Sequence, residues 1–150
     1  MATVAEPVFS AVEAQPVSIP TSARRRIRTV VVDDSETFLQ VVCELLELDP
    51  LVDVVARADR GGEAIETVMR LKPDVVLMDV HMPYLDGLTL AWFFGRRFPS
   101  ARVVLMSTDN TPELRAACED SGAMDFVHKE NFRQEFCAVL ERVTCEPEEG

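Results

Sequence analysis

The stretch PDVVLMDVHMPYLDGL, residues 73–88, decides the fold of this chain. Its first half carries four consecutive apolar residues that run directly into Asp79. A short apolar run rich in valine predicts a buried strand of a parallel sheet. Burying a carboxylate at the end of such a strand is expensive, because the charge loses its hydration. We therefore expect Asp79 to have a chemical task that justifies its position.

Apolar runs of this kind alternate with helical patterns along the chain. The sequence predicts strands at 27–33, 52–58, 74–79, 101–107 and 124–129, and helices at 35–48, 61–71, 87–98, 111–122 and 131–143. Ser35 and Thr111 are the expected N-caps of two of the helices. Alternating elements with nearly continuous apolar strands predict an α/β fold, with a doubly wound parallel sheet of five strands and five covering helices.

Length, composition and charge restrict the class of protein. A chain of 150 residues, 47% of them hydrophobic, is long enough for one globular domain. The net charge of −11 argues against a nucleic-acid partner, and no apolar run approaches the roughly 18 residues of a membrane span. We interpret the basic cluster of Arg24, Arg25, Arg26 and Arg28 as a solvated boundary before the first strand.

Cysteine usage and the two ends of the chain suggest a reducing, cytoplasmic setting. The four cysteines (Cys43, Cys118, Cys137 and Cys145) show no CxxC spacing, and we interpret the first three as buried, reduced thiols in helices. The first residues lack the features of a signal peptide. Residues 1–26 are expected to form a flexible extension, and residues 144–150 a loose acidic tail.

Polar residues end four of the five predicted strands. In an open parallel sheet, the carboxyl ends of the strands form the functional crevice. The residues found there are Asp33, Asp34, Asp79, Ser107 and Lys129. Like carboxylates about 4 Å apart repel by roughly 4 kcal/mol at an effective dielectric constant of about 20. Lys129 and a divalent cation that prefers oxygen ligands, such as Mg²⁺, would offset this repulsion.

A carboxylate, a magnesium ion, an ammonium and a hydroxyl are the groups needed to receive a phosphoryl group. The pattern resembles the CheY-like receiver domain of two-component response regulators, which has a flavodoxin-like fold. The resemblance covers about residues 27–143 and rests on VVVDDS, DVVLMDVHMPYLDGL, VVLMS, SGAMDFV and Lys129. It implies the strand order 2-1-3-4-5. The strand at 52–58, which ends in Ala58 and Asp59 only, then lies at the border of the sheet.

The resemblance also implies a metal site and a phosphoacceptor. Asp79 is the residue expected to carry the phosphoryl group. Asp34 and Asp79 are expected to bind Mg²⁺ directly and Asp33 to bind it through water. The backbone carbonyl of His81 is the further expected ligand.

Four more residues acquire expected roles in phosphoryl binding and switching. Ser107 is expected to donate a hydrogen bond to the phosphoryl oxygens, and Lys129 to pair with them. Phe126, three residues before the lysine, matches the aromatic residue that switches in the family. Thr108 replaces a common alanine beside the phosphoryl site, so its bulk is expected to restrict access.

One departure concerns the residue after Lys129. Many receivers have proline there, whereas this chain has Glu130. A cis peptide bond without proline costs about 3–4 kcal/mol, so the turn that aims the lysine inward lacks its usual support.

By this resemblance the chain is a phosphorylation-controlled switch. A histidine kinase or phosphotransfer protein is the expected phosphodonor. A downstream protein target is expected to bind a surface formed by 111–122, 124–129 and 131–143, which could also hold a homodimer. Catalysis is expected to be limited to self-phosphorylation and autodephosphorylation.

Other functional classes can be compared with the residues present. A phosphatase of the haloacid-dehalogenase type needs a second aspartate two residues after the nucleophile, where this chain has Ser35 after Asp33 and Glu36 after Asp34. Neither GxGxxG nor GxxxxGK[ST] occurs, which argues against a nucleotide-binding enzyme. A pseudo-receiver that binds partners without phosphorylation, and a receiver cut from a longer regulator or hybrid kinase, stay open.

Overall fold

The computed structural model describes residues 25–145, and its centre is one parallel sheet with the strand order β2-β1-β3-β4-β5. The strands are β1 (Ile27–Val32), β2 (Val52–Ala58), β3 (Val75–Asp79), β4 (Arg102–Ser107) and β5 (Asp125–His128). The predicted order is confirmed, and β2 lies at an edge of the sheet, as expected. Of the expected flexible extension (1–26) and loose acidic tail (144–150), residues 1–24 and 146–150 lie outside the described residues, whereas residues 144–145 belong to the last helix.

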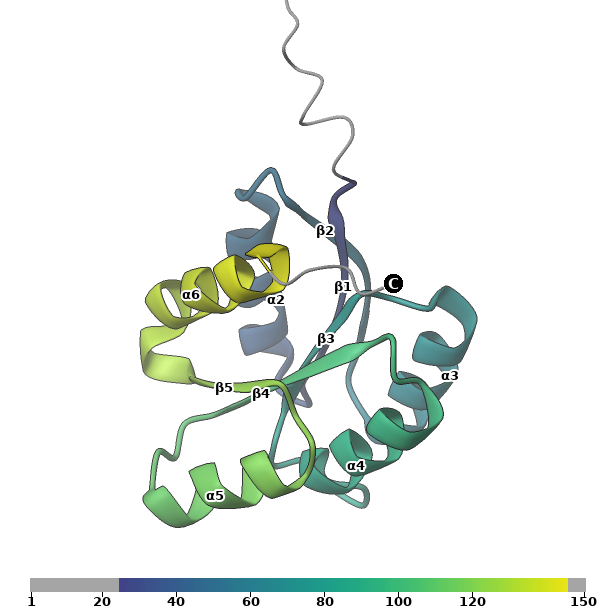
Figure 1. Cartoon of the computed structure of the whole chain (residues 1–150), viewed down its shortest axis with the longest axis vertical. Helices are drawn as coiled ribbons and strands as arrows, with labels where there is room; N and C mark the ends of the chain where they lie inside the picture. Colours follow the sequence, from purple (N-terminus) through teal and green to yellow (C-terminus); the bar gives the residue numbers. More distant parts are fainter. Residues whose placement is uncertain (1–24, 146–150) are drawn as a thin grey trace, which may run out of the picture.

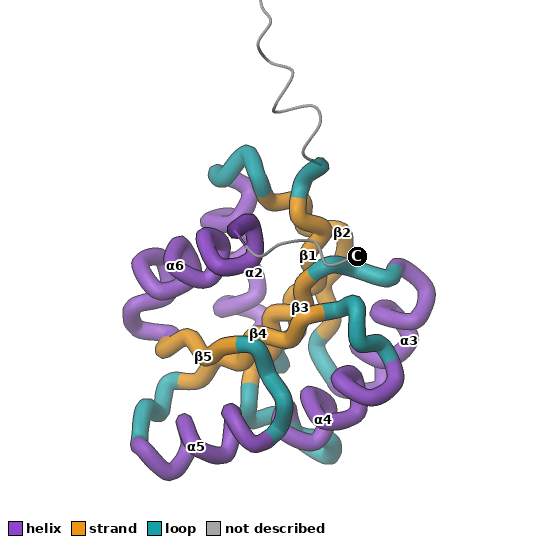
Figure 2. Tube along the Cα trace, in the orientation of Figure 1, coloured by secondary structure: helices purple, strands orange, loops and turns teal. Residues whose placement is uncertain are grey.

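Helices cover both faces of this sheet (Figure 1). They are α2 (Glu36–Glu47), α3 (Gly61–Leu71), α4 (Gly87–Arg97), α5 (Pro112–Asp120) and α6 (Phe132–Cys145), with a short 3-10 helix, η2 (Lys129–Asn131). α2 and α6 lie on one face, and α3, α4 and α5 lie on the other, so that the strands run between two helical layers (Figure 2). The predicted doubly wound architecture is confirmed.

Each face of the sheet has its own hydrophobic core. Along β1, Val30 and Val32 join the cluster beneath α3, α4 and α5, whereas Val31 joins the cluster beneath α2 and α6. This alternation follows from the period of two residues in a strand. Because both clusters are apolar, the central strands carry the continuous hydrophobic runs that mark them in the sequence.

Capping side chains set the starts of three helices. Ser35 accepts a hydrogen bond from Phe38 N, and Thr111 accepts one from Leu114 N, as predicted. Asp86 caps α4 in the same way. Some helix and strand ends differ from the predictions: α6 continues to Cys145, and β5 ends at His128, so that Lys129 opens η2.

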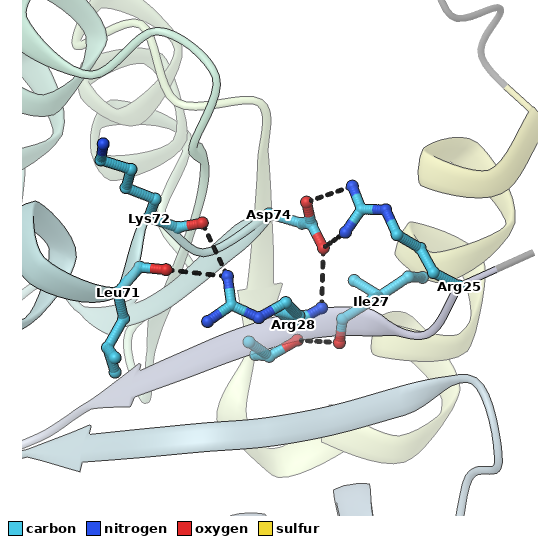
Figure 3. Close-up of polar contacts among 7 residues, drawn as sticks. Arg25, Ile27, Arg28, Leu71, Lys72 and Asp74 are labelled. Carbon is cyan, nitrogen blue, oxygen red and sulfur yellow. Dashed lines mark hydrogen bonds and ion pairs between the residues drawn. The ribbon is translucent and has the colours of Figure 1, made fainter.

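The arginine cluster fastens the start of β1 (Figure 3). Arg25 pairs with Asp74 at 3.0 Å, and the same carboxylate accepts a hydrogen bond from Arg28 N. The Arg28 side chain donates to the carbonyl oxygens of Leu71 and Lys72 at the end of α3, and Arg26 donates to Val52 O. Arg25 and Arg26 are exposed, as a solvated boundary requires, but all three arginines also make polar contacts that the prediction did not include. Arg24 lies outside the described residues.

Cysteine burial differs from expectation at one position. Cys43 and Cys118 are buried free thiols, and burial raises the pKa of both. Cys137 is also free but is exposed on α6, because it lies on the outer side of that helix. The expectation of three buried thiols is therefore wrong for Cys137.

Across residues 25–145, no helix is both long and apolar enough to span a lipid bilayer.

Candidate functional site

Three carboxylates meet at the carboxyl edge of the sheet. Asp33 follows β1, Asp34 comes next to it, and Asp79 is the last residue of β3. One oxygen from each of them lies within 4.8 Å of the others. Asp33 and Asp79 are buried and Asp34 is exposed, so the cluster is closed on one side and open to solvent on the other. Strand pairing produces this arrangement, because β1 and β3 are neighbours in register from Thr29 to Val32.

The two oxygens of Asp33 have different partners. Its Oδ1 accepts a hydrogen bond from Ser35 N at 2.8 Å. Its Oδ2 is buried and receives no hydrogen bond of good geometry, although the Lys129 ammonium lies beside it. A buried carboxylate oxygen is normally hydrogen-bonded or bound to a metal. The donor set, three carboxylates with one such oxygen, therefore fits a small divalent cation.

Lys129 lies across two of the carboxylates. Its Nζ is 2.7 Å from Asp33 Oδ2 and 3.0 Å from Asp79 Oδ1, and only 11% of its side chain is exposed. The ammonium also lies over the Phe38 ring, 4.3 Å from the ring centroid. Burial alone would lower the pKa of Lys129, but the contact with Asp33 and the attraction of both carboxylates outweigh it and raise that pKa. The lysine is thus held in its charged form.

Asp79 experiences the opposite balance. Burial and then repulsion by Asp33 raise the pKa of Asp79 to about 6, and Lys129 offsets this only in part. Asp34 adds a further repulsion. The pocket therefore disfavours the charge of Asp79 more than one ammonium can compensate, and a second cation would favour its ionised form.

The turn after β5 aims Lys129 inward without a proline. Every peptide bond from 25 to 145 is trans, including the one between Lys129 and Glu130. The backbone N–H of His128 donates to Glu135 Oε1 at 2.8 Å, which ties the end of β5 to α6. The missing proline therefore does not prevent the lysine from reaching both carboxylates.

Gly87, near the end of the stretch at residues 73–88, allows a close approach to the backbone of Asp79. A Cβ atom at this position would lie 2.3 Å from Asp79 O, a distance that real structures do not tolerate. The glycine N–H also donates to Val80 O at 2.8 Å. The first turn of α4 thus packs directly on the backbone of Asp79, which holds the carboxylate in place.

Comparison with known proteins identifies the family. The family model described as the response regulator receiver domain matches residues 29–141. The chain belongs to the response regulator receiver domain family. Receiver domains in general bind Mg²⁺ and interact with histidine kinases or phosphotransfer proteins, which agrees with the carboxylate cluster of this receiver.

Two solved receivers have the same fold. The signal receiver domain of NarL from Mycobacterium tuberculosis is 34% identical with a TM-score of 0.75, and the match covers 81% of this chain and 99% of that one. The response regulator domain of CheB from Thermotoga maritima is 32% identical with a TM-score of 0.70, and the match covers 82% of this chain and 100% of that one.

Curated relatives are longer proteins. A protein-glutamate methylesterase/protein-glutamine glutaminase of Symbiobacterium thermophilum is 43% identical over 107 residues, which make up 71% of this chain and 30% of the relative. A second enzyme of that name, from Pseudomonas fluorescens, is 39% identical over 107 residues and 28% of its length. The receiver thus matches less than a third of these relatives.

The end of β4 and the loop after it carry two more of the predicted site residues. Ser107 is buried at the end of the strand, and its Oγ accepts a hydrogen bond from Asp109 N at 2.9 Å. Thr108 is exposed at the rim of the receiver site. Within the described part of the chain, Ser107 makes no hydrogen bond to Asp79.

Both histidines contact this loop, and the sequence analysis did not predict these contacts. His128 Nε2 lies 2.9 Å from Thr108 O, and because a carbonyl only accepts, the ring nitrogen is the donor. His81 Nε2 lies 3.4 Å from Asp109 Oδ2, between two exposed side chains. The only available signal was position: one histidine lies two residues after Asp79 and the other directly before Lys129.

Phe126 is buried and connected to the same loop. It is 8% exposed and pairs with Leu105 of β4 in the sheet register. The Arg115 guanidinium lies 4.8 Å from the centroid of the Phe126 ring, and Arg115 Nε donates to Asn110 Oδ1 at 2.6 Å. Sequence reasoning placed Phe126 but gave no role to Arg115, which links the ring to the loop.

Proposed function

We propose that this receiver accepts a phosphoryl group on Asp79 from a histidine kinase or a phosphotransfer protein. The observation that carries the proposal is the position of Asp79, 3.0 Å from the Lys129 ammonium and beside two further carboxylates at an open strand edge. A carboxylate oxygen of Asp79 forms a bond to phosphorus while the phosphorus–nitrogen bond of the donor histidine breaks. The imidazole leaves with the electron pair of that bond.

Magnesium is the proposed cofactor. Asp33, Asp34 and Asp79 would hold it, together with the backbone carbonyl of His81, and the excess of three carboxylates over the one Lys129 ammonium supports the fit. When bound, the ion supplies positive charge that neutralises both the carboxylate cluster and the phosphoryl oxygens.

Other residues of the site act on the phosphoryl group itself. The Lys129 ammonium pairs with one of its oxygens, and the Ser107 hydroxyl turns from its acceptor role toward Asp109 N to donate a hydrogen bond. Thr108 at the exposed rim limits the approach of small donors. Catalysis by the receiver is restricted to this transfer and to the hydrolysis of its own phosphoryl group.

We infer that phosphorylation is transmitted to α5, β5 and α6. Phe126 is a buried residue of β5 itself, and Arg115 of α5 connects its ring to the loop after Ser107. A charged group with several new hydrogen bonds can shift such a two-state equilibrium by several kcal/mol. The proposed partner is a protein target or a second copy of the chain, in the cytoplasm.

A second candidate function concerns how the receiver passes on its signal. The curated relatives carry this receiver as about 30% of their length, so we infer that it can also work as the regulatory part of a longer protein. In that case the surface on α5, β5 and α6 contacts a domain of the same chain.

Acetyl phosphate with Mg²⁺ tests the proposed chemistry, because a small donor needs no partner protein. Intact-mass spectrometry should show a gain of one phosphoryl group on the wild type. Asp79→Asn and wild type with a chelator should show none. A gain of the same size in Asp79→Asn would contradict the assignment of Asp79.

Magnesium uptake is tested by thermal unfolding. A ligand at about 100 times its Kd stabilises the folded state by roughly 2.7 kcal/mol. Asp34→Asn should reduce this gain, since Asp34 is exposed and its loss opens no cavity. Asp109→Asn, an exposed acid on the neighbouring loop, is the matched control and should keep the gain.

A further inference from the structure

Tyr84 adopts a backbone conformation that tyrosine rarely takes. Its φ angle is +70°, in the left-handed region that favours glycine and asparagine. Such strain usually persists where the surrounding structure compensates for it or where function requires it. Tyr84 receives no compensation from burial, because its relative exposure is 105%. The contacts of the neighbouring residues hold this backbone conformation, but packing does not account for an aromatic ring at this position.

The turn that carries Tyr84 is firmly held. Met82 is buried on one side, and Leu85 packs against the core on the other. Leu85 Cβ fits so closely over Gly61 that a Cβ atom there would lie 2.9 Å away. Leu85 N donates to Pro83 O at 2.7 Å. A rigid aromatic side chain loses little entropy on binding, which is a property of anchor residues in interfaces.

Tyr84 also lies at the edge where a donor must bind. It belongs to the loop that leaves β3, five residues after Asp79. A phosphohistidine can react only if its phosphorus comes into contact with the Asp79 carboxylate, so the surface of the donor must cover the surrounding loops. Acidic side chains predominate among the exposed charged groups on these loops and on the adjoining first turn of α2: Asp34, Glu36, Asp59 and Asp109, with Arg60 among them.

We propose that Tyr84 is the anchor by which this receiver binds its phosphohistidine donor protein. The ring enters an apolar pocket on the donor, and basic residues around that pocket face the acidic rim. This inference rests on the proposed function, because it assumes that Asp79 is the acceptor. Other exposed aromatic residues do not share the position: Trp92 lies on α4 with the Arg96 guanidinium over its ring.

Two kinds of phosphodonor separate binding from chemistry. Acetyl phosphate has no surface for Tyr84 to contact. The protein donor is chosen from a panel of phosphorylated histidine-kinase cores and phosphotransfer domains of the source organism. The one that phosphorylates the wild type fastest is used. Rates are compared for wild type, Tyr84→Gly, Tyr84→Phe and Trp92→Ala, the last as a matched control for loss of an exposed aromatic ring.

Tyr84→Gly should lower kcat/KM with the protein donor about tenfold, the usual effect of losing an aromatic anchor, mainly through KM. Its rate with acetyl phosphate should equal that of the wild type. Tyr84→Phe and Trp92→Ala should both transfer normally. Because glycine removes the strain, Tyr84→Gly should also unfold at a temperature equal to or a few degrees above that of the wild type, which excludes misfolding as the cause.

Equal transfer to Tyr84→Gly and wild type from the protein donor would overturn the inference. So would a panel in which no protein donor phosphorylates wild type while acetyl phosphate does. A failure of acetyl phosphate to modify Asp79 at all would instead count against the proposed function, so the two failures are distinguishable.

Discussion

The two ends of the sheet use charge in opposite ways. At the amino end, Asp74 accepts hydrogen bonds from Arg28 N and from Arg25, while the Arg28 side chain binds the last carbonyl oxygens of α3 (Figure 3). At the carboxyl end, three carboxylates lie together, and the single ammonium of Lys129 pairs with two of them, Asp33 and Asp79. At the first end the one carboxylate is paired with several donors, whereas at the second end three carboxylates exceed the one ammonium.

This difference separates structural charge from functional charge. The paired network at the first end stabilises the start of β1. The unbalanced cluster costs stability, and the same imbalance gives it affinity for cations and for the group they accompany. Substitutions at the two ends should therefore change the free energy of unfolding in opposite directions or by different amounts.

Lys129→Met should have the largest effect. It leaves the buried carboxylates of Asp33 and Asp79 without their cation, and breaking a buried pair typically costs about 3–5 kcal/mol. Urea denaturation in a magnesium-free buffer measures the free energy of unfolding. Lys72→Met, which alters an exposed lysine, is the control and should change little. If Lys129→Met were as stable as the wild type, the cluster would not need the ammonium.

Asp79→Asn should stabilise the protein by about 2–3 kcal/mol at pH 7 without magnesium. The folded-state pKa of about 6 lies above the ordinary 3.8, so ionising Asp79 weakens the fold progressively as the pH rises between these values. The gain from asparagine is complete above pH 6 and should fall to about half at pH 5. Unfolding curves at pH 5 and 7 check this, and a gain that grew toward acid would contradict it.

Asp74→Ala should destabilise by a smaller amount, about 1–2 kcal/mol. The substitution removes the acceptor of Arg28 N and leaves part-buried donors to find water. Thermal unfolding is the measurement. Asp74→Ala should lower the free energy of unfolding and Asp79→Asn should raise it. An increase in stability from both would contradict the difference between the two ends of the sheet.

Arg25→Ala should have the smallest effect, under about 0.5 kcal/mol. Its side chain is 70% exposed, and exposed ion pairs contribute little. The small loss should disappear at high salt, because screening weakens surface pairs. A loss above about 1 kcal/mol that persists in high salt would mean that Arg25 packs as well as pairs.

Local patterns were sufficient to predict most of the fold. The apolar run before Asp79 was predicted as a strand at 74–79 and is β3 at Val75–Asp79, and Ser35 and Thr111 cap the expected helices. These features depend on neighbours within a few residues, and apolar periodicity records them directly. Element ends such as that of α6 were less accurate, since the last turn of a helix depends on its contacts.

Apart from the convergence of the site residues at the strand ends, contacts between distant residues were the part that could not be predicted. Asp74 pairs with Arg25 across 49 positions, and His128 reaches Thr108 across 20. The positive φ of Tyr84 also has no local signal, because tyrosine is not a residue that marks such a conformation. These features depend on which surfaces the packed elements bring together.

By itself, the sequence determined the alternation of strands and helices and the residues that end each strand, because burial in a parallel sheet requires apolar runs and leaves polar residues for their ends. It therefore also indicated which carboxylates would meet. Only the tertiary structure decided how their charges balance, since the 2.7 Å and 3.0 Å contacts of Lys129 with Asp33 and Asp79 depend on side-chain positions at the ends of three strands. Electrostatic energy changes steeply over such short distances, and no pattern of residue types specifies them.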